Sequence, residues 1–252
     1  MRIASNDGAP LWLVEQLPPP KHAYPWPFSP GTPMSMFSEY VTEACSHAFQ
    51  CLYSNVNGFG DQFDAFWRTT ATLFANRSSV LAYELLNEPW AGDIYADPAL
   101  MLPGVTDRHN LQPLYDRAHA AIRALDNTTL IMYEGVTWSL MSTDERLGPG
   151  FEHAPGSDPA GTVLSWHYYC WLLDLPYHFG DNVTRAFCKD WQLNDYFRVV
   201  EAFSERVHRG GPSFLTEFGM CAFPVAPNNT LLDTELCQNV LDASDAHFQS
   251  WT

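Results

Sequence analysis

Segments with helical periodicity alternate along this chain with short apolar runs, and this alternation limits the folds that it can adopt. Apolar residues recur at three- and four-residue steps in Phe63–Phe74 and again in Leu111–Leu125, and an apolar run that ends near a glutamate follows each pattern. Runs that are apolar on both faces are typical of parallel strands covered by helices. The chain is therefore predicted to be an α/β protein with a parallel sheet.

The apolar runs predict five strands. They are Val80–Leu86, Thr129–Glu134, Val163–Tyr169, Ser213–Glu217 and Phe248–Trp251, with further helices expected through Tyr196–Phe203 and Thr234–Ala243. Residues 1–60 are rich in proline, so we expect a long loop there with one short helix near Met36–Gln50. A doubly wound sheet also accommodates five strands, but it predicts a glycine-rich phosphate turn, and we find none in the sequence.

The charge balance restricts the partners. The chain has 252 residues and a formal net charge of −16, with 13 basic against 29 acidic residues. Such a chain repels phosphate backbones, which argues against nucleic acid as a partner. No apolar run reaches the roughly 20 residues that a membrane-spanning helix needs.

Cysteines and glycosylation motifs indicate an oxidising compartment. Asn-x-Ser/Thr motifs begin at Asn76, Asn127, Asn182 and Asn228, beside an even number of six cysteines. We therefore expect a secreted, extracellular or lysosomal glycoprotein. No apolar signal segment opens the chain, so either the true N-terminus is missing or the protein is not exported. Six cysteines allow fifteen pairings. By proximity alone we predict three local disulfides, Cys45–Cys51, Cys170–Cys188 and Cys221–Cys237.

Polar and acidic residues gather where the expected strands end. These ends are Asn87-Glu88-Pro89, Tyr133-Glu134, His167-Tyr168-Tyr169, Glu217-Phe218-Gly219 and Trp251. Chemistry in parallel α/β folds gathers at this edge of the sheet. Carboxylates are costly to bury there unless they have polar partners or a chemical role. Glycoside hydrolysis uses such a pair, one carboxylic acid and one ionised carboxylate.

Three of these strand ends resemble the motifs of a known family. Leu86-Asn87-Glu88-Pro89, His167-Tyr168-Tyr169 and Leu215-Thr216-Glu217-Phe218-Gly219 are similar to the motifs at strands four, six and seven of glycoside hydrolase family 5. The longer stretches Gly8–Trp12, Ala82–Asp93 and Gln249–Trp251 are similar to the endoglycoceramidases of that family. The resemblance covers nearly the whole chain and implies a (β/α)₈ TIM barrel.

The resemblance implies a role for each residue of the site. Glu88 would be the general acid/base, and Glu217 the nucleophile that forms a covalent glycosyl-enzyme. Asn87 would hydrogen-bond the 2-hydroxyl of the sugar, and Tyr169 would hydrogen-bond Glu217 and help to keep it ionised. His167 would line the same rim, and Trp251 would form the floor beneath the sugar ring. Because two carboxylates and water suffice, no metal and no organic cofactor is expected.

Each assignment also has a purely structural alternative. Glu88 fits a carboxylate at a helix start, and Glu217 fits a member of a buried ion pair. His167 and Trp251 fit core positions, and Tyr168 competes with Tyr169 for the place beside the site.

The chain departs from the family pattern at both ends. The family barrel has three strands before the Gly8 stretch, and a C-terminal β-sandwich can follow the barrel. We therefore interpret residues 1–252 as one incomplete catalytic domain that contains strands four to eight, with Glu84 and Glu134 supporting the barrel or its rim. An open segment of a barrel exposes two sheet edges. The 252-residue chain alone is accordingly expected to be poorly stable and weakly active or inactive.

The favoured function is hydrolysis, with retention, of the β-glycosidic bond that joins an oligosaccharide to ceramide. The substrate would be a glycosphingolipid, reached by transient contact with the membrane surface that carries it. One alternative is a family 5 β-glucosidase that acts on glucosylceramide, a steryl glucoside or a β-glucan. Another is a non-catalytic glycolipid-binding relative, and a third is a secreted scaffold without a ligand, which leaves the polar strand ends unexplained.

Overall fold

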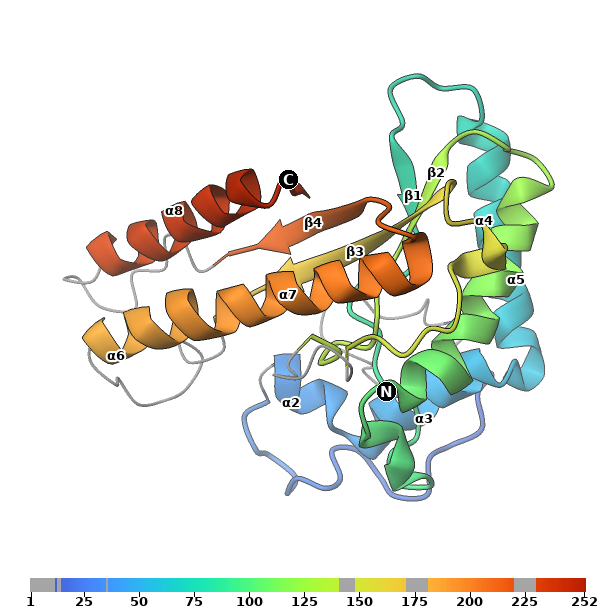
Figure 1. Cartoon of the computed structure of the whole chain (residues 1–252). Coiled ribbons are helices and arrows are strands. Elements are labelled where there is room, and N and C mark those ends of the chain that lie inside the picture. Colours follow the sequence, from blue (N-terminus) through green and yellow to red (C-terminus); the bar gives the residue numbers. More distant parts are fainter. Residues whose placement is uncertain (1–11, 13–14, 35, 141–147, 171–180, 220–229) are drawn as a thin grey trace. The chain divides into compact units, whose positions relative to one another are not determined.

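A computed structural model describes residues 12, 15–34, 36–140, 148–170, 181–219 and 230–252 (Figure 1). The chain divides into two compact units. The first comprises Met1–Thr137 and Pro149–Thr162, and the second comprises Trp138–Gly148 and Val163–Thr252. Both units contain parallel strands and helices, in agreement with the predicted fold class.

The single short helix predicted near Met36–Gln50 is two helices. α2 spans Met36–Tyr40 and α3 spans Glu43–Tyr53. Thr42 separates them because its backbone is extended, with φ −67° and ψ 146°, and its hydroxyl accepts a hydrogen bond from the Cys45 amide at 3.3 Å. Threonine is a preferred residue at a helix N-cap, so a new helix begins here.

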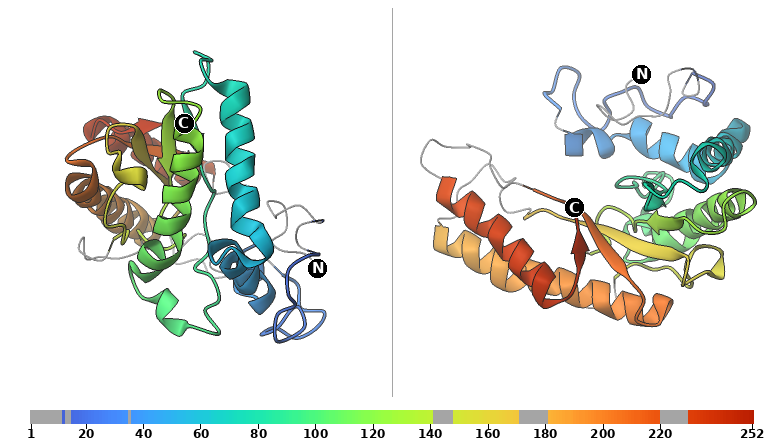
Figure 2. Two further views of the ribbon diagram at one scale, coloured as in Figure 1. Left: turned by 90° about the vertical axis from the view of Figure 1, so that its right-hand side faces the viewer. Right: turned by 90° about the horizontal axis from the view of Figure 1, so that it is seen from above.

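Two long helices of the first unit run side by side (Figure 2). α4 spans Phe59–Phe74, just after the short 3₁₀ turn η1 (Val56–Gly58), and α5 spans Gln112–Arg123. Arg117 on α5 bonds Asp61 and Asp64 on α4, at 2.7 Å in both cases. The periodic apolar face of α4 is only partly covered in the described residues. Trp67 and Ala71 are buried, whereas its neighbours Phe66, Leu73 and Phe74 are exposed.

Two strands form the sheet of the first unit. β1 (Ala82–Glu84) pairs in parallel with β2 (Leu130–Tyr133), in a register that sets Glu84 opposite Met132. The Leu85 amide continues this pairing with a hydrogen bond to the Met132 carbonyl at 2.9 Å. β1 is shorter than the predicted strand Val80–Leu86 and ends two residues earlier, and β2 is one residue shorter at each end than the predicted strand Thr129–Glu134. The described part of this unit also contains three short elements, η2 (Pro98–Met101), the π-helix η3 (Asp107–Leu111) and η5 (Pro155–Ser157).

A buried carboxylate lies just before β2. Asp126 accepts hydrogen bonds from the Tyr83 hydroxyl at 2.9 Å, from the Thr128 amide at 2.9 Å and from the Thr129 amide at 3.0 Å. Burial by itself raises the pKa of Asp126, but the hydrogen bonds from Thr129, Thr128 and Tyr83 outweigh burial and hold this pKa well below its usual value. The charged form of Asp126 therefore stabilises the β1–β2 pair.

Replacing Asp126 by asparagine should lower the free energy of unfolding at pH 7 by about 1–3 kcal/mol, because an amide nitrogen then meets hydrogen-bond donors. A carboxyl group with a depressed folded pKa stabilises above its unfolded pKa and loses that contribution as the pH falls. The difference between wild type and Asp126→Asn should therefore shrink below about pH 4. Urea denaturation at pH 7 and pH 3.5 measures both effects. Glu152→Gln, at a well-exposed carboxylate of the same unit, is the control. A pH-independent difference would contradict this account.

In its described residues, the second unit contains three parallel strands, β3 (Thr162–Tyr168), β4 (Ser213–Phe218) and β5 (Ser250–Trp251), with β3 beginning at the last residue of the first unit. A continuous helical run is formed by α6 (Asp181–Arg185), the π-helix η7 (Ala186–Leu193), α7 (Asn194–Phe203) and the π-helix η8 (Ser204–His208) (Figure 1). α8 (Thr230–Ala246) lies alongside this run (Figure 2). In the core, the Trp166 ring meets the Phe197 ring edge-on at 5.2 Å. Among the described helices, none combines the length and the apolar character needed to cross a membrane.

The three predicted disulfides have different outcomes. Cys170–Cys188 is present and joins the end of β3 to η7, which confirms that pairing. Cys237 is disulfide-bonded, while its predicted partner Cys221 lies outside the described residues.

The predicted bond Cys45–Cys51 is wrong, because both thiols are free. The two residues lie six positions apart on the same helix α3, which separates them by about 9 Å along the axis, and a disulfide tolerates less than about 7 Å between Cα atoms. Burial raises the pKa of Cys45 to about 12 and that of Cys51 to about 11, so neither thiol is a reactive nucleophile at neutral pH.

Candidate active site

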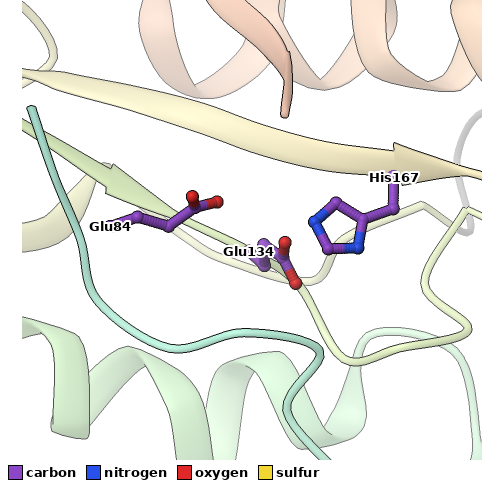
Figure 3. A group of neighbouring side chains, drawn as sticks. All are labelled: Glu84, Glu134 and His167. Carbon is purple, nitrogen blue, oxygen red and sulfur yellow. The ribbon is translucent and has the colours of Figure 1, made fainter. Parts of the chain in front are cut away.

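In the first unit, acidic residues of the candidate site lie at the carboxyl ends of β1 and β2. Figure 3 shows Glu84 on β1 and Glu134 directly after β2, together with His167 on β3 of the second unit. The carboxylate oxygens of Glu84 and Glu134 lie within 4.8 Å of each other. Asn87 and Glu88 follow β1 by a few residues; Asn87 is exposed and Glu88 is half-buried.

The backbone of Glu88 has an unusual conformation. Its φ of 40° lies in the left-handed region, which is uncommon for a residue with a side chain. Such a conformation costs on the order of 1–3 kcal/mol and persists only where the surroundings enforce it. The Glu88 amide donates to Oε2 of Glu134 at 2.7 Å, and the Thr137 hydroxyl donates to the Glu88 carbonyl at 3.0 Å. A hydrogen bond to a charged group contributes about 1.5–3 kcal/mol, enough to offset that cost.

The chain after Glu88 is fixed by a buried indole. Trp90 is only 2% exposed, and its Nε1–H donates to the Ser46 hydroxyl at 2.9 Å. The Tyr53 hydroxyl donates to the carbonyl of Trp90 at 2.5 Å. Helix α3, which carries Ser46 and Tyr53, therefore supports the segment that bears Glu88.

The second unit contributes Glu217, the next-to-last residue of β4. Its side chain is 44% exposed, and the Tyr169 hydroxyl donates a hydrogen bond to its Oε1. Nε2 of His167 lies 3.8 Å from its Oε2, and the His167 side chain is only 10% exposed. Glu217 therefore has polar partners on both oxygens and still presents part of its carboxylate to solvent.

A β-bulge sets Glu217 beside His167. Trp166 pairs with Leu215, but the next residue of β3, His167, pairs with Glu217, so Thr216 is an extra residue on β4. Bulges frequently re-aim a side chain next to an active site. The position of the carboxylate beside the imidazole thus depends on one extra residue in β4.

The two adjacent tyrosines of β3 have different partners. The Tyr168 hydroxyl is buried and donates to the Cys188 carbonyl at 2.6 Å, and burial raises the pKa of Tyr168. Tyr169 bonds Glu217 instead. A side chain at Gly219 would not fit, because a Cβ there would lie 2.7 Å from the Tyr169 ring. The glycine after Glu217-Phe218 therefore makes room for the tyrosine that holds the carboxylate.

Trp251 lies on β5 opposite Leu215. Its indole meets the Phe218 ring edge-on at 6.0 Å and is 45% exposed. An exposed aromatic surface next to the residue that follows Glu217 is suited to stacking on a sugar ring, and the role of Trp251 as a floor stays a prediction.

Two pairs of side chains could contribute to a metal site, Glu84 with Glu134 in the first unit and His167 with Glu217 in the second. Acid–base and nucleophilic chemistry needs only the carboxylates that are present.

For three residues near the reactive groups, the sequence gives little indication of their contacts. Glu134 is predicted only to support the barrel or its rim, and its contact with the Glu88 backbone is not evident from the sequence. Thr137 has no signal in the sequence, and Gly219 belongs to the Glu217 motif without a stated role, because their contacts with Glu88 and Tyr169 depend on backbone conformations that residue types do not reveal.

Comparison with known proteins identifies the family. The family model for cellulases of glycosyl hydrolase family 5 matches residues 44–252. An endoglycoceramidase from Cyanea nozakii is 39% identical over 214 residues, which cover 84% of this chain and 36% of that protein. The chain thus spans about a third of the length of this relative.

Two solved structures of endo-glycoceramidase II from Rhodococcus sp. share the fold. The lactosyl-enzyme intermediate has a TM-score of 0.69 at 19% identity, and the ganglioside GM3 complex has a TM-score of 0.67 at 19% identity. Each comparison covers 97% of this chain and 49% of the other chain. This likeness confirms the predicted fold, a parallel α/β structure that is part of a (β/α)₈ barrel. With a family model that matches most of its length, the chain belongs to glycosyl hydrolase family 5.

Proposed function

We propose that the protein containing this chain hydrolyses the β-glycosidic bond between oligosaccharide and ceramide in glycosphingolipids, with retention of configuration. The observation that carries the proposal is Glu217, a partly exposed carboxylate at a strand end that accepts a hydrogen bond from Tyr169. A carboxylate that accepts a hydrogen bond from a phenol and is open to solvent suits a nucleophile better than a core ion pair.

The reaction proceeds in two displacements. An oxygen of Glu217 attacks the anomeric carbon while Glu88 donates its proton to the glycosidic oxygen, so ceramide leaves as an alcohol and a glycosyl ester forms on Glu217. Glu88, now ionised, removes a proton from water, which attacks the same carbon and releases Glu217. This sequence requires the two carboxyl groups to lie about 5–5.5 Å apart.

The remaining strand-end residues bind the sugar in this proposal. Asn87, exposed beside Glu88, donates to the 2-hydroxyl, where contacts strengthen in the transition state. His167 lines the site beside Glu217, and the exposed indole of Trp251 stacks on the sugar. The ceramide part of the substrate brings the protein into transient contact with a membrane surface.

The substrate class is supported by the relatives. The similar protein from Cyanea nozakii is named an endoglycoceramidase, and one similar solved structure holds ganglioside GM3. The family model, described as cellulase, supports the second candidate, a β-glucosidase acting on glucosylceramide, a steryl glucoside or a β-glucan. A glycolipid-binding protein without activity is a third candidate.

We also propose that the protein is secreted or lysosomal. The disulfide Cys170–Cys188 is typical of an oxidising compartment, and four glycosylation motifs accompany it. The protein is made in a eukaryotic secretory host and treated with an amidase that removes N-linked glycans. A loss of mass of the protein would support this location.

Substrate and stereochemistry are tested together on the natural protein that contains these residues. We expect release of intact oligosaccharide from GM3, with little product from glucosylceramide, a steryl glucoside or cellotetraose. Proton NMR of the first-formed sugar should show the β-anomer, as retention demands. Preference for cellotetraose would favour the β-glucan alternative, and an initial α-anomer would exclude the double displacement. Binding of GM3 without any product would favour the non-catalytic alternative.

A further inference from the structure

We propose that Glu134 is a positioning residue that sets the direction of the Glu88 side chain by holding the Glu88 backbone. The inference rests on the proposed function, in which Glu88 is the acid/base. Glu134 itself is 5% exposed, and its Oε2 accepts the Glu88 amide at 2.7 Å. A carboxylate that is buried and engaged by the backbone is poorly placed to touch a substrate, so Glu134 acts through Glu88.

Both backbone polar groups of Glu88, its N–H and its carbonyl, are fixed by hydrogen bonds. Glu134 accepts a hydrogen bond from the N–H group of Glu88. The Thr137 hydroxyl donates to the carbonyl of Glu88 at 3.0 Å and to the carbonyl of Pro89 at 2.9 Å. The Thr137 amide also donates to the Pro89 carbonyl, at 3.1 Å. Both holding residues lie in the segment that follows β2, so this segment determines the backbone torsions of Glu88.

The torsions matter because they aim the side chain. Residues before proline are restricted to extended conformations in most contexts, yet Glu88 has a φ of 40°. In an extended conformation the Cβ of Glu88 would point in a different direction, and the carboxyl group at the end of the side chain would move with it. Without the hydrogen bonds to Glu134 and Thr137, Glu88 would adopt the extended conformation that a residue before proline prefers, and its side chain would point elsewhere.

The segment that holds Glu88 is itself anchored. Asp107 has no exposed surface, and it accepts the amides of Val136 at 2.7 Å and Gly150 at 2.8 Å. Val136 lies between Glu134 and Thr137 in the sequence. The support for Glu88 therefore passes from a buried carboxylate of η3, through the segment after β2, to the backbone of the acid/base.

The test compares aryl β-glycosides that differ in their need for protonation. A phenyl leaving group needs the acid, whereas 2,4-dinitrophenolate leaves without it. For Glu134→Ala in the natural protein we expect kcat/KM to fall about 100-fold for the phenyl glycoside, the size of effect that misplacement by about 1 Å produces. For the dinitrophenyl glycoside we expect a change of less than about threefold, because glycosylation by Glu217 does not use the misaimed group.

Glu134→Gln keeps an oxygen that can accept the Glu88 amide, so it should restore most of the phenyl glycoside activity. Thr137→Val removes the hydrogen bond to the Glu88 carbonyl. It should show the same dependence on the leaving group as Glu134→Ala, but to a smaller degree. Hydrogen exchange of the Glu88 amide should quicken in Glu134→Ala and stay slow in Thr137→Val. Asp126→Asn, at another buried carboxylate of the first unit that binds backbone amides, is the matched control and should leave the ratio of the two rates unchanged.

Equal losses on both glycosides in Glu134→Ala, or an altered ratio in Asp126→Asn, would overturn the positioning role and leave a general structural one. A wild-type protein that cleaves neither glycoside nor GM3 would instead overturn the proposed function. Slow exchange of the Glu88 amide in Glu134→Ala would contradict the backbone contact itself, whatever the activity.

Discussion

Replacing Glu217 by glutamine should lower kcat/KM for glycosphingolipid and aryl glycoside alike by at least about 10⁴-fold, because no covalent intermediate forms without the nucleophile. The exposed carboxylate with its hydrogen bond from Tyr169 is the basis of this expectation. Loss should not depend on the leaving group, since attack at the anomeric carbon is common to every substrate. Steady-state rates with GM3 and with 2,4-dinitrophenyl β-glycoside measure it.

A labelling experiment identifies the same residue without relying on rates. A 2-fluoro glycoside with a good leaving group should add one glycosyl unit to the wild-type protein, and peptide mass mapping should find it on Glu217. Glu201→Gln, at a more exposed carboxylate of the second unit that pairs with His247, is the control and should label as wild type does. A label on any other residue would remove Glu217 from the nucleophile's role.

The second large effect is expected at Glu88. Glu88→Ala should reduce the hydrolysis of GM3 by about 10²–10⁴-fold, the usual contribution of general acid–base catalysis. The 2,4-dinitrophenyl glycoside should still react in the first step, and the glycosyl-enzyme should then accumulate because no base activates water. Added azide needs no base, so it should raise turnover and yield a glycosyl azide of retained configuration.

The azide experiment separates an acid/base from a merely structural carboxylate. Glu152→Gln, at an exposed carboxylate of the same unit, should show neither the accumulation nor the rescue. If azide left the turnover of Glu88→Ala unchanged while the protein stayed folded, Glu88 would not be the acid/base, and another group would have to protonate the leaving oxygen.

Much of the fold was predictable because buried parallel strands leave a strong pattern. Runs such as Leu130–Tyr133 and Thr162–Tyr168 are mostly apolar and largely buried, and they end next to polar or charged residues. The same reasoning drew attention to Glu88 and Glu217, because carboxylates at strand ends require an explanation. The break between α2 and α3 was missed, since the capping action of Thr42 depends on a backbone conformation that neighbouring residues also influence.

What the sequence could not reveal lies in backbone geometry and in distance. Proximity in the sequence suggested a disulfide between Cys45 and Cys51, but both residues lie on one rigid helix that keeps their sulfur atoms apart. The left-handed conformation of Glu88 contradicts the preference of a residue before proline, and only its hydrogen-bond partners explain it. The choice between Tyr168 and Tyr169 likewise depends on which hydroxyl reaches Glu217.

The extra residue at Thr216 has an implication for how such a protein could change. A regular ladder would set Thr216 opposite His167 and would bring the Glu217 carboxylate level with Tyr168, whose hydroxyl is already engaged by Cys188. Closing the bulge with the sequence unchanged would therefore move the Glu217 carboxylate away from the His167 imidazole, while every reactive side chain stayed in the chain.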